Sequence, residues 1–183
     1  MRRAGLVVAR TLAALREAIV TGTTPRDLDA LASRLIRQAG ATPSFLGYHG
    51  YPATICTSVN DVVVHGIPDD RPLRSGDVIS IDCGAIVDGW HGDAAITVGV
   101  GELDEPVAAL VAACERSLAA GIDSMVASGR LGDIGAAVQA SVEASGGYGI
   151  LTDFTGPGRI WMQTRSTPDF VSWLKSVLPT SRN

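Results

Sequence analysis

The sequence has little that would tie the chain to nucleic acid, to a membrane or to an oxidising compartment. Fifteen lysines and arginines stand against 19 aspartates and glutamates, without a basic run, which argues against nucleic acid as the main partner. No stretch approaches the roughly 18 apolar residues that a membrane span needs. Three cysteines without a CxxC pair favour neither a disulfide framework nor a zinc ribbon. A reducing cytoplasm is therefore the expected location.

The composition is that of a globular chain. It has 183 residues, 46% of them hydrophobic and 19% charged, which is enough to bury a core of its own. Arg2 and Arg3 precede apolar residues, as in secretory signal peptides. Because Arg10 and Glu17 interrupt the apolar run, an amphipathic helix from residue 2 to about residue 20 is predicted instead.

Local signals predict helices on both sides of a set of strands. Thr24 is a typical N-cap, Pro25 suits the first helical position, and Gly40 ends the second predicted helix. Two further helices are expected at residues 105–120, with an apolar stripe that includes Cys114 and Leu118, and at 131–144. Strands are expected at residues 53–59, 62–64, 91–100 and 150–155, and in a segment before residue 88.

The stretch from Ile81 to Asp93 predicts a hairpin, because Asp88-Gly89 is a preferred type I′ turn pair. With this turn, residue 88−k faces residue 89+k, so Asp82 and Asp93 share one face of the sheet. They then lie diagonally, roughly 7–8 Å apart at the backbone. Two such carboxylates can hold a metal pair separated by about 3.5–4 Å. The spacing equally fits one aspartate as a strand-end cap and the other as a solvated turn residue.

Two other segments carry residues of interest. The loop 43–52 is rich in glycine and aromatic residues, which fits either a binding pocket or a packed surface loop. His65 opens the sequence His-Gly-Ile-Pro directly after three valines. A lone histidine is usually structural, although its near-neutral pKa also suits proton handling.

Three segments closely resemble type I methionine aminopeptidases, members of metallopeptidase family M24 with the pita-bread fold. They are GYHGYPATICTSVNDVVVHGIPDD (47–70), SGDVISIDCGAIVDGWHGDAA (75–95) and GYGILTDFTG (147–156). The resemblance runs from about Met1 to Gly156 and implies an α+β fold, an antiparallel sheet flanked by helices. It implies metal-dependent removal of the N-terminal methionine from nascent proteins when a small residue follows. The ribosome is a candidate partner.

The resemblance also implies roles for particular residues. Asp82 matches a bidentate ligand of one metal, and Asp93 matches the carboxylate that bridges two divalent ions, which would be Mn, Fe, Co or Zn. His65 matches a catalytic histidine that hydrogen-bonds the scissile amide of the substrate. The pocket for the methionine side chain is matched by Phe45, Tyr48, Tyr51 and Cys56.

After Gly156 the sequence departs from the family pattern. Pro157 stands where the family has a ligand histidine, and no histidine follows His91 and no glutamate follows Glu143. Of five expected protein ligands only two remain, so we expect impaired activity. The second αβ half is expected to be largely absent, with residues 157–183 forming a divergent tail that contains a helix at 168–178. This leaves an exposed sheet edge through which chains would self-associate.

Two alternatives to the catalytic interpretation stay open. A non-catalytic protein on the same scaffold would bind peptide N-termini through the aromatic loop. A proline dipeptidase would share the fold and cleave a different bond. Retained turnover separates the enzyme from the binding protein, and a preference for Met-Ala over X-Pro peptides separates the two hydrolases.

Overall fold

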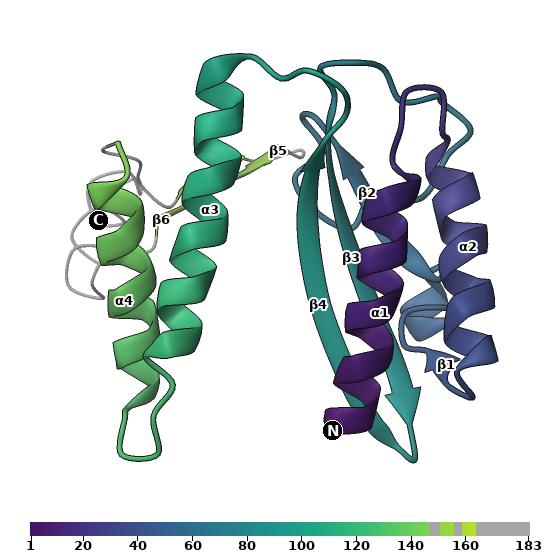
Figure 1. The fold of residues 1–183 in the computed structure, drawn as a ribbon, viewed down its shortest axis with the longest axis horizontal. Coiled ribbons are helices and arrows are strands. Elements are labelled where there is room, and N and C mark those ends of the chain that lie inside the picture. The colour runs from purple at the N-terminus through teal and green to yellow at the C-terminus, as the bar shows by residue number, and fades with distance from the viewer. Residues whose placement is uncertain (147–150, 156–158, 164–183) are drawn as a thin grey trace, which may run out of the picture. The chain divides into compact units, whose positions relative to one another are not determined.

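The computed structural model describes residues 1–146, 151–155 and 159–163. It divides the chain into two compact units, Met1–Val111 and Ala112–Asn183. In the first unit, two helices cover one face of an antiparallel sheet (Figure 1). Its elements are α1 (Arg2–Ala18), α2 (Pro25–Gln38), β1 (Thr42–Pro43), the 3₁₀ turn η1 (Tyr48–Gly50), β2 (Ile55–Val59), β3 (Val78–Val87) and β4 (Trp90–Gly99). The predicted α+β class is confirmed.

β3 is the central strand of this sheet. β4 pairs with its whole length on one side, and β2 and β1 share the other side one after the other. Side chains of a strand alternate between faces, and on β3 Ile79, Ile81 and Cys83 are fully buried. They form one core with residues of the two helices, among them Val8, Leu12, Leu15, Leu28 and Ile36. The opposite face of β3 carries Asp82.

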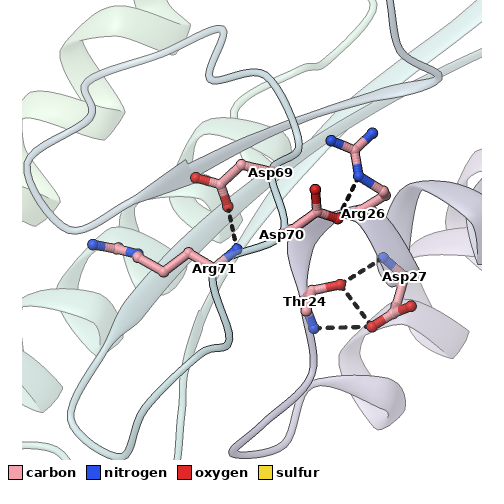
Figure 2. Close-up of polar contacts among 6 residues, drawn as sticks. All are labelled: Thr24, Arg26, Asp27, Asp69, Asp70 and Arg71. Atoms are coloured by element: carbon pink, nitrogen blue, oxygen red, sulfur yellow. Dashed lines mark hydrogen bonds and ion pairs between the residues drawn. The ribbon is translucent and has the colours of Figure 1, made fainter.

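The start of α2 is fixed by the predicted N-cap. The Thr24 hydroxyl accepts a hydrogen bond from the Asp27 N–H, while the Asp27 carboxylate accepts one from the Thr24 N–H (Figure 2). The same helix end holds a distant loop, because the Arg26 side chain pairs with Asp70 (Figure 2). The Arg26 backbone N–H also donates to the Asp69 carbonyl. The segment that follows His-Gly-Ile-Pro is therefore anchored on α2.

The predicted strand at residues 62–64 is wrong. β2 ends at Val59, and Asn60 turns the chain with a φ of 53°. The Asn60 side chain then donates a hydrogen bond to Asp77 and accepts one from the Val78 N–H. These side-chain bonds hold the turn without any strand pairing of the residues that follow. The valines that follow are 44–53% exposed.

The second unit contains most of α3 (Glu105–Asp123), α4 (Leu131–Ala144) and the paired strands β5 (Leu151–Thr155) and β6 (Arg159–Gln163). The apolar stripe expected on α3 is wrong in detail, because Leu118 is 58% exposed and the buried side carries Ala113, Ser117 and Gly121. These small residues let α4 approach, and a Cβ on Gly121 would lie 2.8 Å from Val138 Cγ2. The sequence did not predict β6, and the helix expected at 168–178 lies outside the described residues. None of the helices among the described residues combines the length and the apolar character that a membrane span requires.

We expect Thr57→Val to stabilise the protein by about 1 kcal/mol. Thr57 lies opposite Ile81, on the core face of the sheet, and its buried hydroxyl has no hydrogen-bond partner among the described residues. Valine has the same shape without the unsatisfied hydroxyl. Urea unfolding would measure the gain, with Thr97→Val as the control, because Thr97 shares a 2.8 Å hydrogen bond with Ser80. Equal effects of the two substitutions would contradict this account.

Candidate functional site

The acid pair lies where the hairpin parity predicts. Asp88 and Gly89 have φ values of 51° and 77°, as a type I′ turn requires. The register places Asp93 opposite Gly84 and Ala95 opposite Asp82. Asp82 and Asp93 therefore lie diagonally on one face of the sheet, the face away from the helices.

This face opens into a pocket of about 540 Å³. All seven residues predicted for the site line it, although their individual roles remain predictions. Four further lining residues were not predicted and lie within two positions of predicted ones in the same two loops: His49, Gly50, Pro52 and Ile67. The full lining is Phe45, Tyr48, His49, Gly50, Tyr51, Pro52, Cys56, His65, Ile67, Asp82 and Asp93. His91 is not part of it and hydrogen-bonds Ser44 at 3.2 Å.

Burial and charge combine at Asp82. Partial burial raises the pKa of this carboxyl to about 6, and the neighbouring charge and hydrogen bond of Asp93 add to the increase, while a charge on His65 opposes it. Cys56, directly opposite Asp82 on β2, also has a raised thiol pKa because of burial. The neighbouring carboxylates of Asp82 and Asp93 therefore concentrate negative charge in the pocket, and a bound cation would reduce the repulsion between them.

Glycine at position 84 makes room for the aromatic wall of the pocket. A Cβ there would lie 2.8 Å from both Phe45 Cε1 and Ser44 Cβ. The Ser44 N–H also donates to the Gly84 carbonyl at 3.0 Å. The loop that carries Phe45 is thus laid directly on the central strand, beside the acid pair.

His65 enters the pocket from a left-handed backbone conformation, with a φ of 57°. The next residue is held against β2: the Gly66 carbonyl accepts from the Thr57 N–H at 2.9 Å, and the Gly66 N–H donates to Ser58 Oγ at 3.3 Å. A Cβ on Gly66 would lie 2.1 Å from the Thr57 carbonyl oxygen, so only glycine fits. This contact fixes the position of the His-Gly-Ile-Pro segment.

The two carboxylates suit a hard divalent cation, which prefers oxygen ligands. Among the described residues, however, no group of three or more His, Cys, Asp or Glu side chains is arranged to hold a metal ion. The described site thus offers a cation two carboxylates, those of Asp82 and Asp93.

The family model of metallopeptidase family M24 matches residues 1–171, past the Gly156 at which the motif resemblance ends. The chain belongs to metallopeptidase family M24. Among its M24 relatives, methionine aminopeptidase 1 of Mycobacterium tuberculosis is 51% identical over 164 residues, covering 86% of this chain and 62% of the relative. A methionine aminopeptidase of Clostridium acetobutylicum is 47% identical, with 86% and 63% covered. The chain thus spans less than two thirds of the length of these relatives.

Solved M24 structures agree with the fold. The crystal structure of methionine aminopeptidase from Rickettsia prowazekii superposes with a TM-score of 0.77 at 33% identity, covering 91% of this chain and 70% of that one. A prolidase from Pyrococcus furiosus superposes with a TM-score of 0.66 at 16% identity, which shows a common fold alone. The predicted pita-bread architecture is confirmed as that of the M24 family.

Proposed function

We propose that this chain carries the substrate pocket and two metal ligands of a metal-dependent aminopeptidase, a hydrolase that removes the N-terminal methionine from new proteins. The observation that carries the proposal is the pocket itself. It joins an aromatic wall, a histidine and a diagonal pair of aspartates in about 540 Å³. The identity of 51% to a methionine aminopeptidase supports the choice of this reaction over that of other M24 hydrolases.

Each part of the pocket then has a distinct task. The flexible thioether of methionine packs among Phe45, Tyr48, Tyr51 and Cys56, since sulfur makes favourable contacts with ring edges. His65 donates a hydrogen bond to the scissile amide. Asp82 and Asp93 hold divalent ions, which when bound supply Lewis-acid polarisation of the carbonyl and activation of water.

We further propose that these 183 residues alone turn over slowly. Pro157 occupies a position where the family pattern has a ligand histidine, and proline cannot coordinate a metal. The described residues supply no third ligand beside the acid pair. The same observation favours one second candidate function, non-catalytic binding of peptide N-termini. A proline dipeptidase is a weaker candidate, because the prolidase neighbour shares only the fold.

The proposed setting is the cytoplasm, where nascent chains whose methionine is followed by a small residue are the substrates and the ribosome is a partner. Self-association is proposed through the outer edge of β4, with which no described strand pairs. Ala94 and Ala95 are exposed along it. Light scattering that gives a strict monomer would count against this edge contact.

Release of methionine from a Met-Ala-Ser peptide by the full chain with Mn²⁺ tests the function. An Asp93→Ala variant, purified in parallel, reveals any contaminating host enzyme. Slow release that the variant lacks would support the proposal, and faster release from X-Pro peptides would favour the dipeptidase. If no release exceeds that of the variant, calorimetric titration with the same peptide decides between a binding protein and no peptide function.

A further inference from the structure

The hydroxyl of Tyr51 is used inside the protein, although its ring lines the pocket. Its single proton is shared between the Gly66 carbonyl oxygen, 2.9 Å from the hydroxyl oxygen, and the Ile55 carbonyl oxygen, 3.1 Å away. The Cys56 side chain is a further hydrogen-bond partner of this hydroxyl. Burial raises the pKa of the phenol above its ordinary value, so it remains a neutral donor. The hydroxyl is therefore committed to two segments of backbone, the start of β2 and the residue after His65.

One end of this connection is firmly held. On α2, the Asp29 carboxylate accepts from the backbone N–H groups of Thr54 and Ile55 at 2.7 and 3.0 Å. Charge-assisted hydrogen bonds of this kind are stronger than neutral ones. Ile55 is hydrogen-bonded to Asp29 of α2 through its N–H and to the Tyr51 hydroxyl through its carbonyl. These bonds fix the position of the phenol hydroxyl relative to α2.

The other end is under strain. His65 has a φ of 57°, a conformation that non-glycine residues adopt only when their surroundings impose it. Thr57 and Ser58 hold Gly66 from the β2 side, through its carbonyl and its N–H respectively. The Tyr51 hydroxyl adds a second bond to the same carbonyl from the pocket side. Together these three partners form a clamp on the residue that follows His65.

We propose that Tyr51 is a positioning residue, whose hydroxyl fixes the His65 backbone through the Gly66 carbonyl and so keeps the imidazole in the pocket. The value of that orientation rests on the proposed function, in which His65 contacts the scissile amide. The ring and the hydroxyl of Tyr51 then have separate roles. The ring lines the substrate pocket, and the hydroxyl keeps the His65 side chain in place.

Tyr51→Phe separates the two, because it keeps the ring and removes the hydroxyl. The chain has three histidines, so the imidazole carbon-bound proton resonances of His65 can be assigned in the full chain with His49→Gln and His91→Gln variants. We expect Tyr51→Phe to shift and broaden the His65 resonances and to leave those of His91 in place. Tyr48→Phe, which changes another tyrosine of the same pocket, should leave His65 unchanged. His65 resonances that superpose in Tyr51→Phe and the unmodified chain would overturn the proposal.

Two further measurements keep the test decisive. If Tyr51→Phe fails to fold by circular dichroism, the unmodified chain is examined for nuclear Overhauser effects from the Tyr51 hydroxyl proton to the α protons of Gly66 and His65; their absence overturns the clamp. If the unmodified chain releases methionine, Tyr51→Phe should lower kcat by about 10- to 100-fold with little change in KM. If the unmodified chain releases no methionine, the proposed catalytic function is refuted. The His65 resonances in Tyr51→Phe then still decide whether Tyr51 positions His65.

Discussion

Replacement of Gly66 by alanine is expected to destabilise the first unit by about 3 kcal/mol and to displace His65 from the pocket. The added methyl group would lie 2.1 Å from the carbonyl oxygen of Thr57 and 3.2 Å from Val62 Cγ1. Thr57 belongs to the paired strand β2, so its carbonyl cannot move without breaking the ladder to β3. The loop must move instead and lose the hydrogen bonds that Gly66 makes with β2.

Urea unfolding followed by far-UV circular dichroism measures this loss. Gly5→Ala is a matched control in the same unit, because Gly5 lies in α1 and nothing lies within 4 Å of the position its Cβ would take. Alanine there should be neutral or stabilise by up to about 1 kcal/mol, since glycine is a poor helix former. Similar unfolding midpoints for the two variants would show that the loop tolerates the methyl group and that it does not constrain His65.

Asp82→Asn is expected to abolish Mn²⁺ binding and at the same time to stabilise the metal-free chain near neutral pH. In the folded protein the Asp82 carboxylate is partly buried beside Asp93, an arrangement that disfavours its charged form. Asparagine has nearly the same shape and carries no charge. The gain at about pH 7.5 should be on the order of 1 kcal/mol, because a half-exposed carboxylate is partly screened by solvent.

The pH dependence of stability gives this prediction its sign. The pKa of Asp82 is about 6 in the folded state and 3.8 ordinarily, so the folded protein binds the proton more tightly. The stabilising contribution of the protonated Asp82 carboxyl is complete when the pH is below its ordinary pKa of 3.8. This contribution is lost as the pH rises through about 6. With EDTA present, the unfolding midpoint of the unmodified chain should fall more between about pH 5 and about pH 7.5 than that of Asp82→Asn.

Asp88→Asn is the control for Mn²⁺ binding. It removes a carboxylate from the tip of the same hairpin, where asparagine tolerates the positive φ of 51°. Calorimetric titration should give the same Mn²⁺ affinity for Asp88→Asn as for the unmodified chain and no heat of binding for Asp82→Asn. Retained binding in Asp82→Asn would place the metal elsewhere.

Sequence patterns were most informative where one local rule determines a larger structure. The Asp88-Gly89 pair sets the turn, the turn sets the register, and the register places both aspartates on one face. Thr24 and Pro25 likewise define the start of α2, which is capped as predicted. In both cases the geometry depends on residues close together in the chain.

The failures arose where a distant contact decides the outcome. Valine has a high β propensity, yet the segment at 62–64 forms no ladder, because Asn60 diverts the chain and bonds to Asp77. On α3, apolar residues occur on more than one side, and close approach at Gly121 selects the face of small residues. The clamp on Gly66 joins residues from β2 and two loops, and the sequence shows no trace of that arrangement.

The alternation along β3 restricts how the length of this hairpin can change. Asp82 lies six residues before the first turn residue, and its neighbours in sequence point into the core. Deleting one residue between Asp82 and the turn would send its carboxylate into the apolar interior and bring the thiol of Cys83 or another core side chain into the pocket. Deleting two would instead place the two aspartates directly opposite each other. An insertion or deletion between either aspartate and the turn can therefore keep both carboxylates on the pocket face only if it changes that strand by an even number of residues.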